Sequence, residues 1–201
     1  MIAPPPRTRN PPSERHVLPE NPAHPAIDDL SQPFPQTPRG TRWSVVTDGV
    51  MGGLSAGSLA RTQRDGRPCL RLTGDVSLAN DGGFLQAALD LAPGAAPVDA
   101  AVWSGIALTV AGPPETYNLH LRTTDITRPW QSYRAGFTLG PAWAQVRLPW
   151  SAFVPHRTDA PFAPARLRRI GLVAIGRAFH ADLFVADIRF FRTAETDPPP
   201  R

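Results

Sequence analysis

Apolar and polar side chains alternate along short runs of this chain from residue 43 onward. A period of two residues is typical of a β-strand with one buried and one solvated face. The alternating runs are residues 70–72, 106–110, 117–121, 146–148 and 184–190, with Phe184, Ala186, Ile188 and Phe190 as the apolar positions of the last run. No apolar stripe of helical period persists for three turns, although residues 163–169 are compatible with one helical turn.

The pattern predicts an all-β fold. Many short strands separated by turn residues indicate a sandwich or barrel and not a β-α-β arrangement. One polar and one apolar face per strand predicts antiparallel sheets that pack through a shared core. Residues 171–176 are apolar on both faces, so we expect that strand to be central. Asp65-Gly66 and Asp81-Gly82 are expected to form hairpin turns.

Length and proline distribution predict one domain with unstructured ends. The chain has 201 residues, which is enough for a single core of substantial size. Residues 1–25 combine proline with polar residues and have almost no apolar period, so they cannot offset their own ordering entropy. We therefore predict a disordered Pro-rich arm at residues 1–25, a β-sandwich domain at residues 26–193 and a disordered tail at residues 194–201.

The charged residues exclude several kinds of chemistry. All 21 basic residues are arginines, so no lysine is present to form a Schiff base or to bind a phosphate. The formal net charge is +4, and only Arg166, Arg168 and Arg169 lie close together in sequence. A nucleic-acid surface needs clustered cations, so no nucleic-acid partner is predicted.

Cysteine content and hydropathy predict a soluble protein. Cys69 is the only cysteine, which excludes an intrachain disulfide and a cysteine metal cage. The N-terminus has no apolar signal core, and the longest uncharged stretch, residues 100–114, is too short to span a bilayer. We therefore expect a bacterial, cytoplasmic protein without membrane insertion.

No catalytic or metal site is predicted from the residue spacing. Residues 53–57 match the G-x-S-x-G string of serine hydrolases, but that motif requires a strand-to-helix turn on an α/β sheet. Ser55 is therefore interpreted as structural. The alternative is a hydrolase in which Ser55 acts with one of the histidines. The histidines and acids show no zinc or paired-carboxylate spacing. No cofactor is predicted, although a calcium ion near Asp48 or Asp81 stays an open alternative.

The segment at residues 49–53 contains three glycines. Its backbone amides could bind an anion, but it lacks the lysine, the hydroxyl residue and the helix start of a phosphate loop. Glycines permit tight turns and close backbone approach. We expect a tight turn in which Met51 is an apolar plug.

Polar side chains are predicted to share one sheet face. Alternate residues of a strand point the same way, so neighbouring strands can align their polar positions. A face with arginines, an amide and an imidazole is a candidate partner- or ligand-binding surface, and an ordinary solvated face is the alternative. The residues are Asn118, His120, Arg122, Arg134, Gln145 and Arg147.

A set of motifs in a specific order spans about residues 27–192. It begins with Trp43 and the segment at residues 48–53, and includes Tyr117, Trp143, Leu148-Pro149-Trp150 and Asp187-Ile188-Arg189. In these motifs the chain resembles the NADH:ubiquinone oxidoreductase (complex I) intermediate-associated protein 30 domain family. Two segments, residues 112–115 and 182–183, which the sequence leads us to expect in loops, depart from the family pattern. The loop motifs, which we interpret as mainly structural, are Trp43, Asp48, Gly49, Met51, Gly52, Gly53, Ser55, Gly82, Gly83 and Phe84.

The resemblance implies an antiparallel jelly-roll β-sandwich that is galactose-binding-domain-like and similar to family 11 carbohydrate-binding modules. Mitochondrial members of the family are non-catalytic assembly chaperones for respiratory complex I. We therefore expect a non-catalytic protein-binding domain, and a respiratory-complex subunit or assembly intermediate as its partner. The alternative is a carbohydrate-binding module with a sugar ligand. Tyr117 and Tyr133, however, are predicted to face away from the polar row.

Overall fold

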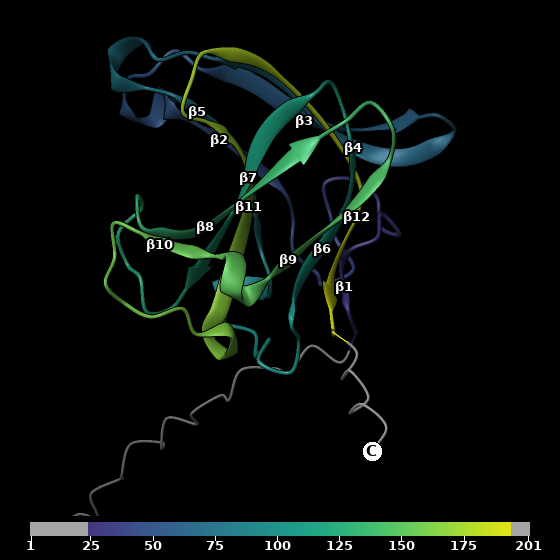
Figure 1. The fold of residues 1–201 in the computed structure, drawn as a ribbon, viewed down its shortest axis with the longest axis vertical. Coiled ribbons are helices and arrows are strands. Elements are labelled where there is room, and N and C mark those ends of the chain that lie inside the picture. Colours follow the sequence, from purple (N-terminus) through teal and green to yellow (C-terminus); the bar gives the residue numbers. More distant parts are fainter. Residues whose placement is uncertain (1–23, 194–201) are drawn as a thin grey trace, which may run out of the picture.

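The computed structural model describes residues 24–193 (Figure 1). The predicted arm lies outside this range except for His24 and Pro25, and the predicted tail lies wholly outside it. The strands are β1 (Ala26–Asp28), β2 (Ser44–Thr47), β3 (Ala56–Arg64), β4 (Arg67–Val76), β5 (Phe84–Asp90), β6 (Gly105–Ala111), β7 (Glu115–Thr123), β8 (Ser132–Leu139), β9 (Ala144–Pro149), β10 (Val154–His156), β11 (Leu167–Ile175) and β12 (Phe179–Phe191).

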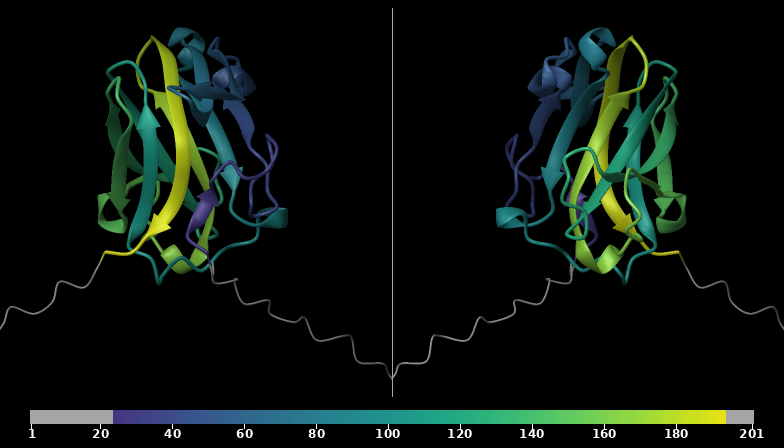
Figure 2. Two further views of the ribbon diagram at one scale, coloured as in Figure 1. Left: turned by 90° about the vertical axis from the view of Figure 1, so that its right-hand side faces the viewer. Right: turned by 90° about the vertical axis from the view of Figure 1, so that its left-hand side faces the viewer.

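The strands form two six-stranded antiparallel sheets that pack as a jelly-roll sandwich (Figures 1 and 2). In the β12 sheet the order is β3-β4-β12-β6-β9, and β1 also pairs with β12. In the β11 sheet the order is β10-β8-β7-β11-β5-β2. The prediction of an all-β sandwich is therefore confirmed, and β11 lies between β7 and β5 as expected for a central strand.

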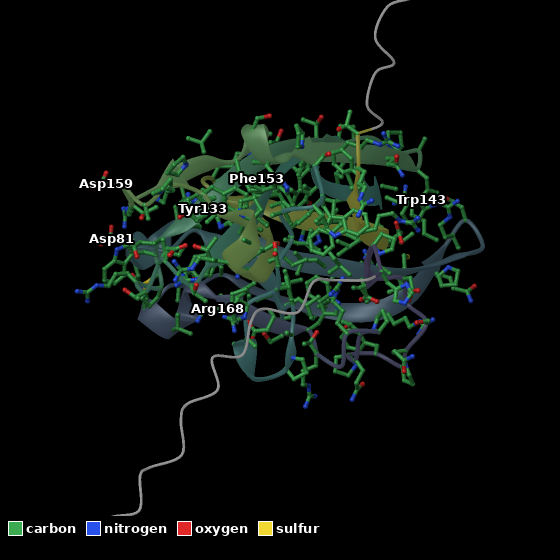
Figure 3. The ribbon with its side chains drawn as sticks, turned by 90° about the horizontal axis from the view of Figure 1, so that it is seen from below. Asp81, Tyr133, Trp143, Phe153, Asp159 and Arg168 are labelled. Carbon is green, nitrogen blue, oxygen red and sulfur yellow. The ribbon has the colours of Figure 1, made fainter. Side chains whose placement is uncertain are left out.

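Alternating apolar residues from both sheets fill the interior. Leu72 and Leu108 from the β12 sheet and Leu119 and Leu172 from the β11 sheet are fully buried. Figure 3 shows Tyr133 and Phe153 among these side chains, and Asp159 at the periphery. Apolar area removed from water is the main term that stabilises such a core.

A β-bulge changes the orientation of side chains along β12. The register of β12 against β6 shifts between Val185 and Asp187. Before the shift Leu183 and Val185 are buried in the core, and after it Ile188 and Phe190 are. The sequence-based assignment of Phe184 and Ala186 to the core face is therefore wrong. An extra residue in one strand reverses the alternation beyond it.

The expected turns have different outcomes. Asp65-Gly66 joins β3 to β4 with positive φ at both residues, so that hairpin is confirmed. The prediction of a hairpin at Asp81-Gly82 is wrong, because the chain there leaves the β12 sheet at β4 and enters the β11 sheet at β5. Of residues 163–169, Pro164–Arg166 form a short 3-10 helix, η5, and β11 begins at Leu167.

The other helical elements are also short 3-10 segments. They are η1 (Asp48–Met51), η2 (Ala79–Asp81), η3 (Pro93–Ala95) and η4 (Trp150–Ala152). Within residues 24–193 no helix has the length and apolar character needed to cross a membrane. The loops that contain η1 and η2 lie at one end of the sandwich, opposite the two ends of the described chain (Figure 2).

Candidate interaction surfaces

A buried carboxylate joins the two glycine-containing loops. Asp48 is fully buried at the start of η1. Its Oδ1 accepts the backbone N–H of Ser55 at 2.9 Å, and its Oδ2 accepts the Ser55 hydroxyl at 2.5 Å. The same Oδ2 accepts the backbone N–H groups of Gly83 at 2.5 Å and Phe84 at 3.2 Å. One side chain therefore fixes two loops that are far apart in sequence.

The balance of burial and hydrogen bonding keeps Asp48 ionised. Burial raises the pKa of a carboxyl, because it disfavours the charged form. The hydrogen bonds from Ser55, Gly83 and Phe84 stabilise the charged form and outweigh burial, so the pKa of Asp48 lies below its usual value. The loops are consequently joined through a charged acceptor, which makes stronger hydrogen bonds than a neutral one.

Two glycines make this close approach possible. A Cβ on Gly53 would lie 2.3 Å from Cγ of Asp48, and a Cβ on Gly82 would lie 2.5 Å from its Oδ2. Side chains at these positions would displace the carboxylate. The glycines are therefore explained by proximity to Asp48, and Gly52, with φ of 88°, by the left-handed turn that ends η1.

The same loops expose four large apolar side chains, which we call the apolar loop cluster. Val50 is 75% exposed, Met51 69%, Leu54 62% and Leu78 52%. The two loops are held together, since the Asn80 side chain donates to the Gly52 carbonyl at 3.1 Å. The prediction of Met51 as an apolar plug is therefore wrong, because the tight turn points this side chain into solvent.

Ser55 is part of the loop structure and does not resemble a nucleophile. Its hydroxyl donates to Asp48 and accepts the backbone N–H of Ser77 at 2.9 Å. The side chain is buried, and β3 follows it where a hydrolase would have a helix. Among the described residues no three His, Cys, Asp or Glu side chains are grouped as metal ligands.

The six polar residues predicted to share a face are divided between the two sheets. β7 and β8 are neighbours in the β11 sheet, so Asn118, His120, Arg122 and Arg134 do lie on one face. Strand β9, with Gln145 and Arg147, is at the edge of the β12 sheet. The predicted single surface is therefore wrong. The chain crosses to the other sheet between β8 and β9.

His120 lies at the centre of the polar group on the β11 sheet. It is in register with Arg134 on one side and Gly171 on the other. Its side chain is only 8% exposed, and its Nε2 has no hydrogen-bond partner within residues 24–193. Burial lowers the pKa of His120 to about 3, and the charge of Arg134 and the neighbouring His156 add to the effect. The imidazole is therefore neutral at pH 7.

The two arginines beside His120 are partly engaged by their own chain. Arg122 donates through Nη1 to the carbonyls of Pro129 at 2.7 Å and Gln131 at 3.1 Å, which holds the β7–β8 loop. Arg134 donates through Nε to the Ser132 hydroxyl at 3.0 Å. Both side chains are half-buried. This face consequently offers fewer free donors than its sequence indicates.

The buried aromatic residues have structural hydrogen bonds. Tyr117 and Tyr133 are fully buried. The Tyr117 hydroxyl accepts the backbone N–H of Asp182 at 2.8 Å, and the Tyr133 hydroxyl donates toward the Ala160 carbonyl at 3.1 Å. Trp43 is also buried, and its Nε1 donates to the Asp28 carboxylate at 2.7 Å. The prediction that both tyrosines face away from the polar row is confirmed.

Sequence reasoning missed Val50, Leu54 and Leu78 as surface residues. The available signal was a set of large apolar residues inside glycine-rich loops, where no strand periodicity assigns them to a core. Large apolar side chains exposed on neighbouring loops are candidates for an interaction site. The cluster is therefore the candidate site that geometry adds to the sequence-based set.

Comparisons with solved structures support the architecture. A family 11 carbohydrate-binding module from Clostridium thermocellum, solved with a β-1,3-1,4-mixed-linked tetrasaccharide, is 11% identical and has a TM-score of 0.67, covering 86% of this chain and 98% of that one. A family 30 module of a cellulosomal cellulase from the same organism is 16% identical with a TM-score of 0.53, covering 76% and 95%. At such identities the likeness shows the fold alone.

The family follows from the sequence match. No curated protein matches the chain. The family model described as Complex I intermediate-associated protein 30 matches residues 33–184 and includes both loops joined by Asp48. Since this match covers most of the sequence, the chain belongs to the Complex I intermediate-associated protein 30 (CIA30) family.

Proposed function

We propose that this chain is a non-catalytic protein-binding domain that acts as an assembly factor for a respiratory, complex I-like or other membrane-associated complex. The observation that carries the proposal is the apolar loop cluster. Its side chains are exposed, yet the loops beneath them are fixed by the buried Asp48 carboxylate. A rigid apolar surface binds a partner at a low cost in conformational entropy.

The family supports the kind of partner. Its description names an association with complex I intermediates. Within the described part of the chain no acid–base or nucleophile arrangement accompanies the cluster, since Ser55 is committed to Asp48 and Ser77. The half-buried polar residues Asn118, Arg122 and Arg134 on the β11 sheet are proposed as a second contact area.

The carbohydrate-binding alternative rests on the fold of the structural neighbours. Sugar sites usually stack a ring on an exposed aromatic side chain. Tyr117 and Tyr133 are in the core, and Trp130, which is 53% exposed, already has the Arg128 guanidinium 6.0 Å from the centre of its ring. Glycan arrays and calorimetry at millimolar sugar test this alternative, and we expect no binding. Saturable binding by the unmodified chain would favour it.

Substitution of the cluster tests the main proposal. We expect Met51→Asp with Leu54→Asp to reduce co-purification of respiratory-complex subunits, and to lower the amount of assembled complex on native gels. Val154→Asp is the matched control, because Val154 is 64% exposed on the edge strand β10. If the cluster variant and the control recover the same subunits and the same amount of complex, the proposal is wrong.

A further inference from the structure

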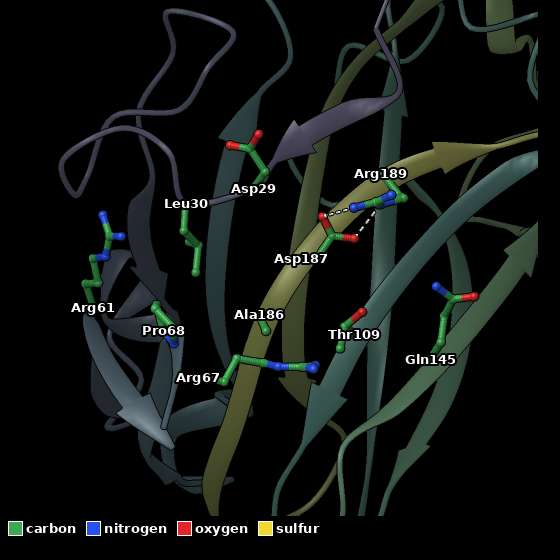
Figure 4. Close-up of a pocket in the computed structure, with 10 residues that line it drawn as sticks. All are labelled: Asp29, Leu30, Arg61, Arg67, Pro68, Thr109, Gln145, Ala186, Asp187 and Arg189. Carbon is green, nitrogen blue, oxygen red and sulfur yellow. Dashed lines mark hydrogen bonds and ion pairs between the residues drawn. The ribbon is translucent and has the colours of Figure 1, made fainter. Parts of the chain in front are cut away.

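A groove of about 500 Å³ crosses the outer face of the β12 sheet (Figure 4). Asp29 and Leu30 form one wall, and Ala186 forms part of the floor. Arg67 comes from the start of β4, and Gln145 lies on the far side on β9. Its volume is within the range of about 300–1,000 Å³ that is typical of ligand sites.

Arg67 is the least engaged cation of the groove. Within residues 24–193 its side chain has neither an ion-pair partner nor a hydrogen bond. Its Cζ lies 5.4 Å from the centre of the Trp143 ring, which fixes the guanidinium by a cation–π contact. Figure 4 shows the side chain extended across β12, beside Ala186 and with its guanidinium end near Thr109. The small Ala186 leaves room for this arrangement.

The other groove cations differ in how far they are neutralised. Arg189 makes a bidentate pair with Asp187, at 2.6 Å and 2.9 Å. Among the residues that the structure describes, Arg61 donates only to the Gln32 carbonyl, at 2.9 Å. Asp29 is the remaining carboxylate of the lining. The lining therefore has an excess of positive charge, with three arginines against two aspartates.

Thr109 and Gln145 add neutral hydrogen-bond donors along one row of the sheet. They are register partners on β6 and β9, and Thr109 is also in register with Asp187 on β12, whose carboxylate is paired with Arg189. The Gln145 Oε1 accepts from Arg147 Nε at 3.0 Å, so its amide N–H groups are available to a ligand. Arg147 adds a further cation beside the groove. Carboxylates only accept hydrogen bonds, and guanidinium groups bind them in a planar fork.

The shape favours a chain over a single ion. The row from β4 to β9 crosses four strands. At about 4.8 Å between strands this is about 14 Å, the length of about four extended residues. We propose that this groove binds a short, extended acidic segment, rich in Asp and Glu, of a partner protein. The proposal is independent of the apolar loop cluster, which involves other residues.

Fluorescence anisotropy of the full chain with labelled hexaglutamate tests the proposal. We expect saturable binding that weakens as salt rises, and at least tenfold weaker binding of hexaglutamine. Arg67→Ala should weaken hexaglutamate binding about five- to tenfold, as expected when a fixed charge contact is lost. Far-UV circular dichroism and thermal unfolding check that the variant is folded.

Arg128→Ala is the matched control. Arg128 is exposed, and its Cζ lies 6.0 Å from the centre of the Trp130 ring, so this variant also loses one charge and one cation–π contact. We expect less than a twofold change. Equal weakening by both variants would show non-specific attraction and overturn the proposal. It would also be overturned by absence of hexaglutamate binding, or by inorganic phosphate competing as well as hexaglutamate at equal charge.

Discussion

The Asp48 carboxylate accepts a 2.5 Å hydrogen bond from the backbone N–H of Gly83, which lies 35 residues away in sequence. This bond joins the loop after β2 to the loop before β5. It explains why the Asp48 motif and the Gly82-Gly83 motif occur together. The apolar loop cluster depends on it, because both loops supply exposed side chains.

Asp48→Asn should reduce the free energy of unfolding by about 2–4 kcal/mol, because an amide nitrogen cannot accept the N–H and O–H groups that now face the carboxylate. Urea denaturation followed by tryptophan fluorescence measures the loss. Asp159→Asn is the control, since Asp159 is exposed (Figure 3), and should change stability by less than about 0.5 kcal/mol. Equal stabilities would contradict the role of Asp48.

Gly53→Ala should destabilise the domain by about 1–3 kcal/mol, because the added methyl group overlaps the Asp48 side chain. Gly140→Ala is the matched control, since a Cβ there meets nothing within 4 Å. Thermal unfolding of the two variants gives the comparison. If Gly53→Ala unfolds at the same midpoint temperature as the control, Gly53 is not packed closely against Asp48 and the explanation of this glycine is wrong.

His120 predicts a specific dependence of stability on pH. Its pKa is about 3 in the folded protein, against about 6.5 in the unfolded chain, so the unfolded chain binds the proton more tightly. The free energy of unfolding therefore falls as the pH falls through this range. The His120 contribution to stability is complete above pH 6.5 and declines between pH 6.5 and pH 3, with a limiting slope of about 1.4 kcal/mol per pH unit.

Urea unfolding between pH 7.5 and pH 4 tests this dependence. His120→Leu should remove that part of the slope, whereas His180→Gln, a variant of an exposed histidine, should keep it. The difference in this slope between the His120→Leu variant and the unmodified chain separates the contribution of His120 from that of the carboxylates that titrate in the same range. Identical slopes for His120→Leu and the unmodified protein would show that this imidazole is not buried in its neutral form.

Tyr133→Phe should cost about 1 kcal/mol of stability, because the Tyr133 hydroxyl donates toward the carbonyls of Ala160 and Pro161 inside the sandwich. Chemical denaturation measures the cost. The partner subunits should be recovered as before, since Tyr133 has no exposed surface. Normal stability together with loss of a ligand would instead assign Tyr133 to a binding site.

Local periodicity was sufficient to predict half of the twelve strands. β4, β6, β7 and β9 each contain the alternating run that indicated them, and β11 is apolar on both faces because it is central. The prediction failed at the bulge near Ala186, where one extra residue reverses the faces without any change in composition. It also failed at Asp81, where turn residues mark a crossing between sheets.

The candidate site was less predictable, because it depends on contacts between distant segments. Gln145 and Arg147 were grouped with His120 on the assumption that consecutive strands are neighbours, whereas β9 pairs with β6. Met51 was assigned to the interior because it is apolar. Its exposure follows from the path that Asp48 imposes on the loop.

Site-specific photo-crosslinking in the native cell tests the central claim most directly. A benzophenone amino acid at position 51, in the apolar loop cluster, should form an adduct with a respiratory-complex subunit or assembly intermediate, and the same residue at position 154 should not. Adducts of equal yield at both positions, or none at position 51 in cells that assemble the complex, would contradict the account.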